Sequence, residues 1–249
     1  MIHIKNKSAI EKMKEAGRRL SSIFCEMQMQ VVPGVSTLAI DGWIEKQLFS
    51  SQLVSKSKGY YGYAHVSCIS VNDVVVHGVP KDSIILSEGD IVKVDVCASW
   101  SGYCADMART YFVGRPLNDQ VVQLVRVAQS ALDAGIEKAR LNNRLSDISS
   151  AIQNEIDKYG FGIIQDFAGH GIGKQMHEEP DVLNYGVPGE GPRLLPGMAF
   201  AIEPMITMGH HDVYIAEDNW TVKTIDKSLA AHVEDTVIVT QDGPLVITR

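Results

Sequence analysis

One short sequence pattern occurs twice in the chain and constrains the fold more than any other feature. LSEGDIVKVDV at 86–96 and LLPGMAFAIEP at 194–204 each place a glycine turn before a β-forming run. In each copy an acidic residue, Asp95 or Glu203, stands at the same position of that run. A carboxylate on the buried face of a strand is costly unless something neutralises it. The repetition therefore predicts two similar halves, each of which brings an acid to a buried place.

A second acidic residue follows each copy of the pattern. Asp106, in ADMARTYFVG, comes eleven residues after Asp95, and Glu234, in HVEDTVIVT, comes 31 residues after Glu203. A run rich in β-branched or aromatic residues, typical of a strand, follows each of these second acids. The duplication therefore predicts that four acids, two from each half, point toward one shared place.

Four carboxylates in one apolar pocket require neutralisation, because like charges a few ångström apart drive some of them to protonate. Two divalent cations would cancel the four charges. A histidine beside glycine also lies upstream of each copy, at His77 and His170. Carboxylates with one imidazole suit Mn²⁺, Fe²⁺, Co²⁺ or Zn²⁺, and bridging carboxylates hold two such ions ~3.5–4 Å apart. We therefore expect a dinuclear metal site.

Such a site favours hydrolysis of a peptide bond over that of a phosphate ester, because four carboxylates leave the metals little residual positive charge. A metal-bridging water has a lowered pKa and can attack an amide carbonyl at neutral pH. An acid beside the water can take its proton, and a histidine that is not a ligand can stabilise the oxyanion or assist the leaving amine. His77 and His177 are available for that role beside the candidate ligand His170.

Composition and charge narrow the class of protein further. The 249 residues are 45% hydrophobic and 21% charged, as in an ordinary soluble domain. A formal net charge of −7 argues against nucleic acid or an anionic membrane as the main partner. No apolar run approaches the ~20 residues that span a bilayer, and MIHIKNKSAI lacks the apolar core of a secretory signal. We expect a cytoplasmic protein whose four cysteines are reduced thiols.

Helix and strand signals come in blocks rather than in strict alternation, which predicts an α+β fold in one domain. Ser8 and Glu11 have capping-box spacing for a first helix that Pro33 closes, and Ser36 precedes a second. Residues 59–80 and those after 162 carry strand and turn signals. The expected helices span 8–31, about 37–54, 117–140 and 146–159.

Five stretches together resemble the type I methionine aminopeptidases: CISVNDVVVHGVP, VDVCASWSGYCADMARTYFVG, GHGIGKQMHEEP, AIEPM and VEDTVIVT. They cover most of the chain in the order and spacing of that family. The resemblance implies a pita-bread fold, in which two pseudo-symmetric halves share a central curved antiparallel sheet flanked by helices. Residues 1–249 would form a single catalytic domain, with halves at roughly 60–140 and 141–249 after the N-terminal helices.

The resemblance also implies a role for each matching residue. Acids that match Asp106 and Glu234 bridge the two metals in the family, and the acid that matches Asp95 binds one metal with both oxygens. The complete ligand set would be Asp95, Asp106, His170, Glu203 and Glu234. Glu203 would also be the general base. His77 and His177 match two histidines implicated in substrate binding and in stabilisation of the intermediate.

The implied reaction removes the initiator methionine from nascent polypeptides with a small second residue, by attack of the bridging water on the peptide carbonyl. The implied partners are nascent N-termini, with the ribosome as a further candidate, and the enzyme is expected to be a monomer. The methionine pocket matches Tyr60, Tyr63, Cys68, Met176 and Trp220. Two positions depart from the family: Ser57 stands where many relatives have cysteine, and Met176 where phenylalanine is common.

Two other readings stay open. A Xaa-Pro aminopeptidase or prolidase shares the five-ligand pattern, but those enzymes usually carry a large N-terminal domain, and only 76 residues precede His77 here. Type II methionine aminopeptidases carry an insertion for which the 25 residues between His177 and Glu203 leave no room. A pita-bread module that binds without catalysis is the other alternative, although all five ligands are present.

Overall fold

The computed structural model of the protein describes residues 1–249. The helices are α1 (Lys7–Met27), α2 (Thr37–Ser50), α3 (Asp119–Lys138) and α4 (Leu145–Asp157), with a short 3-10 turn η1 (Tyr60–Gly62). The strands of the first half are β1 (Val54–Ser55), β2 (Cys68–Val71), β3 (Val74–Val76), β4 (Ile91–Trp100) and β5 (Tyr103–Phe112). The later strands are β6 (Gly162–Ile163), β7 (Gly169–Gly171), β8 (Glu178–Val182), β9 (Ala199–Ile202), β10 (Met205–Thr207), β11 (Val213–Ile215), β12 (Val222–Thr224), β13 (Ala230–His232), β14 (Glu234–Val239) and β15 (Pro244–Val246).

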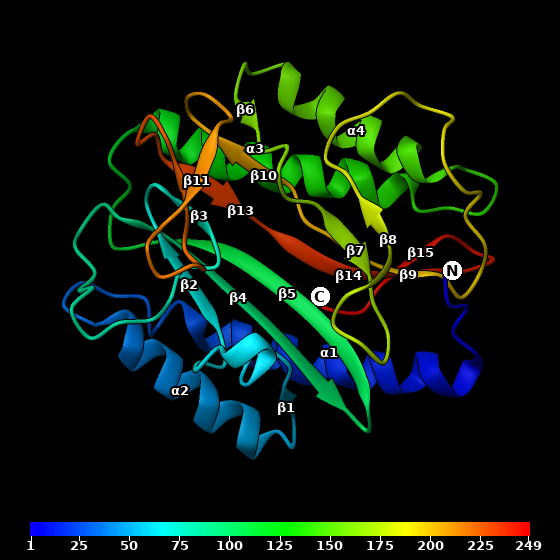
Figure 1. Ribbon diagram of the computed structural model, residues 1–249, viewed down its shortest axis with the longest axis horizontal. Helices are drawn as coiled ribbons and strands as arrows, with labels where there is room; N and C mark the ends of the chain where they lie inside the picture. The colour runs from blue at the N-terminus through cyan, green and yellow to red at the C-terminus, as the bar shows by residue number, and fades with distance from the viewer.

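A nine-stranded antiparallel sheet runs through the middle of the molecule (Figure 1). Its strands follow the order β1-β4-β5-β14-β9-β7-β8, with β2 beside β4 and β15 beside β14. The order is symmetric about the β5–β14 boundary: the hairpin β4–β5 lies on one side and the pair β14–β9 on the other. Two three-stranded sheets, β13-β10-β6 and β11-β12-β3, complete the strands.

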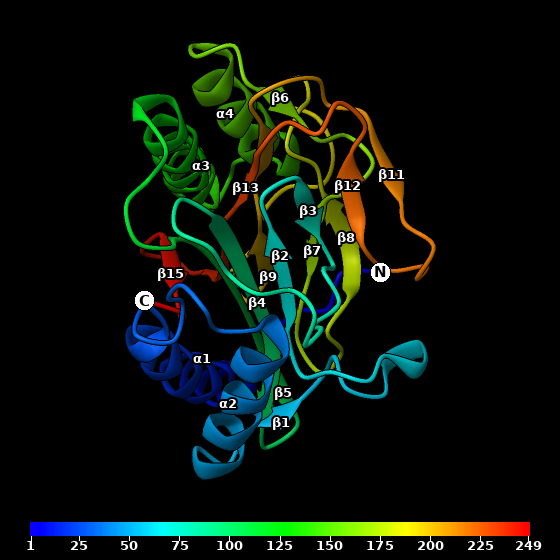
Figure 2. The ribbon, with the colours of Figure 1, turned by 90° about the vertical axis from the view of Figure 1, so that its left-hand side faces the viewer.

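The helices pack on one face of this sheet, a pair over each half. Figure 2 shows α1, α2 and α3 to the left of the central strands and β3, β11 and β12 to the right. Val94 and Val96 of β4 share a buried apolar cluster with Leu20 of α1. Phe200 of β9 shares a second cluster with Leu124 of α3. Because side chains alternate across a strand, the residues between these apolar ones face the other side.

This architecture confirms the α+β, pita-bread class with two pseudo-symmetric halves. The sheet order explains the repeated turn-and-strand pattern, since its two copies lead into β4 and β9, which occupy equivalent places in the sheet. The division of the chain into halves at 60–140 and 141–249 stays a prediction. None of the four α-helices combines the length and apolar character that crossing a bilayer requires.

The predicted start of the first helix is wrong. The helix begins at Lys7, with Asn6 as its N-cap: the Asn6 side chain accepts a hydrogen bond from the Ala9 backbone at 2.9 Å. Asparagine is as good an N-cap as serine, and capping at Asn6 places Ser8 inside the first turn. Glu11 pairs with Lys14 instead of closing a capping box.

The predicted ends of the first two helices are too late. The first ends at Met27, and turns carry the chain to Pro33. The second, capped by Ser36 as predicted, ends at Ser50, because Val54 and Ser55 pair with β4 instead. Tertiary pairing therefore overrides the local helical pattern at this end. The other two helices lie within two residues of their predicted bounds.

Candidate active site

The register of the first hairpin places two predicted ligands on one face of the sheet. Asp95 on β4 pairs with Ala108 on β5, and Cys97 pairs with Asp106. Directly paired residues share a face, and so do residues two apart in a strand. Asp95 and Asp106 therefore lie side by side on the face opposite the helices.

The same face continues across the centre of the sheet. Ala108 pairs with Glu234 on β14, and Ala201 on β9 pairs with both Thr236 and His170 on β7. Glu203 lies two residues beyond Ala201, at the end of β9. This face therefore carries all five predicted ligands: Asp95, Asp106, His170, Glu203 and Glu234.

The donor atoms of these residues are close enough to share metal ions. One donor atom from each of Asp106, His170 and Glu234 lies within 4.8 Å of the others. His170 Nε2 is 3.6 Å from Glu203 Oε1 and 4.0 Å from Asp106 Oδ2. Two ligands at 2.0–2.3 Å from one ion stand at most ~4.6 Å apart, so the cluster needs only small adjustments to bind metal.

No lysine or arginine neutralises these acids. The only basic side chains within 4.0 Å of the four carboxylates are the imidazoles of His170 and His232. Glu234 Oε1 is buried without a hydrogen-bond partner. An unpartnered buried carboxylate oxygen is rare and costly, so the donor set fits divalent cations better than it fits the chain alone.

Burial raises the pKa of all four carboxyl groups. For Asp106, burial and the charge of Glu203 raise the pKa to about 7. For Glu203, burial raises the pKa to about 8. For Asp95 and Glu234, burial and then the charge of Asp106 raise the pKa well above the ordinary carboxyl range. Without added positive charge, the cluster therefore resists full ionisation at pH 7.

His170 is oriented as a metal ligand. Its Nδ1 lies 3.0 Å from the Gly171 carbonyl oxygen, so Nδ1–H donates there and the Nε2 lone pair faces the carboxylates. Burial lowers the pKa of His170 to about 4, which keeps the ring neutral. A side chain at Gly171 would lie 2.2 Å from the Glu179 carbonyl oxygen, so only glycine fits the close approach of β7 to β8.

His77 is half-buried beside the cluster in an unusual backbone conformation. Its φ of +57° is in the left-handed region, which is strained for a non-glycine residue. The Gly78 backbone N–H donates to Ser70 Oγ at 3.0 Å, and a Cβ at Gly78 would lie 2.3 Å from the Ile69 carbonyl oxygen. The ring packs edge-on against Phe167 at 5.5 Å. Burial lowers the pKa of His77 to about 4.

His177 contacts both a predicted ligand and a pocket residue. Its ring stands edge-on to the ring of His170, with centroids 4.4 Å apart. Its Nδ1 is 3.2 Å from the hydroxyl oxygen of Tyr60. The contact with Tyr60 leaves Nε2 as the ring nitrogen without an assigned partner.

All the residues predicted for the methionine pocket line one cavity of about 120 Å³ together with the acids. Tyr63 is buried, its hydroxyl donates to the Ser67 carbonyl at 2.9 Å, and its ring lies 4.9 Å from that of Trp220. Met176 and Ser57, the two positions that depart from the family, line the same cavity. A wider cleft of about 500 Å³ shares His77, Asp95, His170, His177 and Glu203 with it.

Two residues near the site were missed in the sequence. His232 lies 3.2 Å from Glu203 Oε2, and the H-V-E order places it two residues before Glu234, a period-two signal that could have identified it. Asp41 of α2 accepts from the Val66 and Ser67 backbone N–H groups at 3.1 and 3.0 Å, and so anchors the loop that carries Tyr60 and Tyr63. No local pattern marks Asp41, because its partners are 25 residues away.

Comparison with known proteins gives the class of this site. The sequence pattern of metallopeptidase family M24 matches residues 11–241, and the chain belongs to this family. A metallopeptidase uses divalent metal ions, in agreement with the clustered carboxylate and imidazole donors.

Within the family, the full-length relatives are methionine aminopeptidases. The methionine aminopeptidase of Clostridium acetobutylicum is 42% identical over 100% of this chain and 99% of its own length. The crystal structure of the enzyme from Thermotoga maritima superposes with a TM-score of 0.98 at 40% identity and covers 100% of both chains. The Xaa-Pro dipeptidase of Bacillus anthracis reaches a TM-score of 0.79 at 26% identity and is covered over only 62% of its length. The resemblance seen in the motifs is confirmed.

Proposed function

We propose that this metalloaminopeptidase removes the N-terminal initiator methionine from nascent polypeptides whose second residue is small, in the cytoplasm. The observation that carries the proposal is the convergence of four buried acids and one histidine, with no neutralising lysine or arginine, on a cavity lined by aromatic and sulfur-containing side chains. The full-length likeness to methionine aminopeptidases supports the substrate, and the match to Xaa-Pro dipeptidase covers less of that enzyme.

The site would hold two divalent ions, from among Fe²⁺, Mn²⁺, Co²⁺ and Zn²⁺. Asp106 and Glu234 occupy the two central strands of the cluster, and we assign them the bridging positions. Asp95 would bind one ion, and His170 with Glu203 the other. When bound, the ions supply Lewis-acid polarisation of the peptide carbonyl and a water of lowered pKa.

Glu203 is the proposed general base. Burial raises its pKa to about 8 in the protein alone, and added positive charge would bring it down toward the operating range of a base. Its carboxylate, which is 13% exposed, lines both the inner cavity and the outer cleft, so it can take a proton from the attacking water and return it to the leaving amine.

His77 and His177 would act on the substrate from the lining of the cleft. Both are outside the ligand cluster and both line the inner cavity and the outer cleft. The Tyr60 hydroxyl at Nδ1 holds the ring of His177 in place, which leaves Nε2 to hydrogen-bond the peptide. Strain at His77 is maintained by the Gly78 contacts, as expected for a group held in a productive position.

The inner cavity would take the methionine side chain, and the outer cleft the rest of the peptide. Tyr63, Trp220 and Cys68 give an apolar, polarisable surface, and a thioether packs well against aromatic rings. Met176 in place of a ring leaves this wall more adjustable, because methionine has three rotatable bonds.

Hydrolysis of two peptides tests the proposal. The metal-free protein is supplied anaerobically with Fe²⁺, Mn²⁺ or Co²⁺ and given Met-Ala-Ser, with Ala-Pro-Ser as the matched control. We expect release of free methionine and no release of alanine. Release of alanine alone would identify a Xaa-Pro aminopeptidase. Intact Met-Ala-Ser with every metal would show the proposed function to be wrong.

A further inference from the structure

The position of His232 is determined by its backbone, independently of any ligand. It is 1% exposed, and its strand β13 pairs with β10, where His232 lies opposite Met205. Its backbone N–H donates to Thr110 Oγ1 at 3.2 Å, and the same hydroxyl donates to the His232 carbonyl at 2.7 Å. Contacts from β5 and β10 therefore hold the ring against the edge of the cluster.

Glu203 lies between two imidazoles, one at each of its oxygens. Oε1 is 3.6 Å from His170 Nε2, and Oε2 is 3.2 Å from His232 Nε2. The nitrogen of His232 is buried and has no aligned hydrogen-bond partner, although Oε2 is within reach. Hydrogen bonds of catalytic groups commonly become aligned only in the loaded site. A small rotation of either side chain would complete this one.

We propose that His232 is a positioning residue for Glu203. Its Nε2–H donates to Oε2 and thereby leaves Oε1 directed at the metal position that Glu203 shares with His170. The proposal rests on the dinuclear site proposed above. A carboxylate that binds a metal usually accepts a hydrogen bond from a residue outside the ligand set. Without that hydrogen bond the carboxylate can rotate or bind the metal with both oxygens.

The competing role for His232 is that of a sixth ligand. One donor atom from each of Glu203, His232 and Glu234 lies within 4.8 Å of the others, so the spacing alone allows it. The distance favours donation: Nε2 lies 3.2 Å from Oε2, which is within the ordinary reach of a hydrogen bond. One nitrogen cannot both ligate an ion and donate to Oε2.

Two substitutions at one position separate these roles. His232→Ala removes the donor, and His232→Gln keeps an N–H donor on a side chain of similar reach. Removal of an outer partner of a ligand typically costs ~10–100-fold in metal affinity. We expect that loss, for one of the two ions, when Mn²⁺ is titrated into metal-free His232→Ala in a calorimeter. We expect His232→Gln to bind both ions within about fivefold of the wild-type affinity, because most of that loss is restored with the donor.

The Co²⁺ absorption spectrum gives a second readout that does not depend on turnover. If His232 only positions Glu203, the visible band of Co²⁺-loaded His232→Gln keeps the wild-type position and intensity. A shifted band would show that His232 is a ligand and would overturn the proposal. Wild-type affinity for both ions in His232→Ala would overturn it as well.

Controls separate folding and the proposed function from this inference. Val233→Ala removes a buried side chain next to His232 that packs in the helix-side cluster instead. It should fold and bind metal as the wild type does, whereas parallel losses in Val233→Ala and His232→Ala would attribute the effect to packing and refute the positioning role. Failure of the wild-type protein to bind two ions would contradict the proposed function itself.

Discussion

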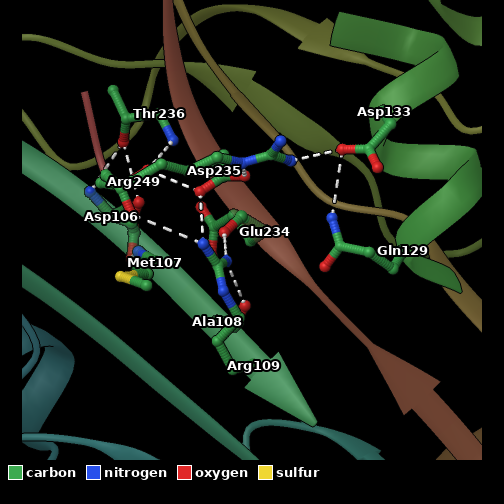
Figure 3. Close-up of polar contacts among 11 residues, drawn as sticks. Asp106, Met107, Ala108, Arg109, Gln129, Asp133, Glu234, Asp235, Thr236 and Arg249 are labelled. Carbon is green, nitrogen blue, oxygen red and sulfur yellow. Dashed lines mark hydrogen bonds and ion pairs between the residues drawn. The ribbon is translucent and has the colours of Figure 1, made fainter. Parts of the chain in front are cut away.

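The two faces of β14 carry neighbouring buried acids with opposite surroundings. Asp235, on the helix side, is fully paired: its Oδ1 accepts from Arg109 and from the Thr248 hydroxyl, each at 2.7 Å, and its Oδ2 accepts from Arg249 at 2.7 Å (Figure 3). Glu234, on the other side, is 2% exposed, has no cationic partner, and has an oxygen without any hydrogen bond.

The difference shows that this fold can neutralise a buried acid from within and does so at Asp235. At Glu234 it does not, and three further carboxylates gather beside it. Burial without a partner destabilises the folded chain, so stability does not account for the cluster. Binding of cations does, because it converts the unfavourable charge into ligand contacts.

The largest expected effect comes from loss of Glu234, to which we assign a bridging role. Glu234→Ala should lower the turnover of Met-Ala-Ser by several orders of magnitude, because loss of a carboxylate that both ions would share should leave the second ion weakly held. Metal analysis after dialysis should find fewer than two ions per chain. Full metal content with lost turnover would mean that Glu234 acts otherwise than as a ligand.

A substitution at His77, which is outside the ligand set, should lower turnover without loss of metal. His77→Ala should lower turnover about 10²–10⁴-fold, as expected for a group that stabilises the transition state or transfers a proton. Its metal content, measured as for Glu234→Ala, should stay near the wild-type value. Loss of metal would show that His77 is itself a ligand.

A substitution at Asp235, on the helix side of β14, should lower the stability of the folded protein. Asp235→Asn leaves Arg109, whose side chain is 19% exposed, without its counter-charge. Breaking a fully buried pair costs about 3–5 kcal/mol, and this partly exposed pair should cost less. Urea unfolding should show that loss, whereas the fraction that remains folded should keep the metal content of the wild type. Loss of metal at unchanged stability would remove the distinction between the two faces.

The smallest effect is the dependence of stability on pH in the metal-free protein. Above pH ~7.5 the buried histidines are almost entirely neutral in both the folded and the unfolded chain and contribute little slope. Asp106 and Glu203, with pKa values raised to about 7 and about 8, then bind more protons in the folded state than in the unfolded one. Stability should therefore fall as pH rises from ~7.5 to ~8.5.

Metal should remove this slope, because bound cations keep the carboxylates ionised throughout that range. Urea unfolding at pH ~7.5 and pH ~8.5, with Mn²⁺ and with a chelator, measures both states. An equal slope with and without metal would place the responsible groups outside the site.

Much of the site could be predicted from residues close together in sequence. The alternation around Asp95 and Glu203, the glycines beside His170, and the spacing of the motifs depend on local geometry, which a strand or turn expresses wherever it lies. The repetition of one pattern predicted two similar halves, but not the order of their strands in the sheet. The family resemblance then added the roles of individual residues.

The sequence alone does not distinguish the surroundings of adjacent acids such as Glu234 and Asp235. Which of them faces the metal position and which meets two arginines depends on the register of β14 against β5, whose paired residues are more than 120 positions apart. A shift of one residue would exchange them. The contacts of Asp41 and His232, and the early end of the second helix, are decided in the same way by partners distant in sequence. Side-chain type and period are local properties, whereas the surroundings that neutralise a charge exist only after the strands have paired.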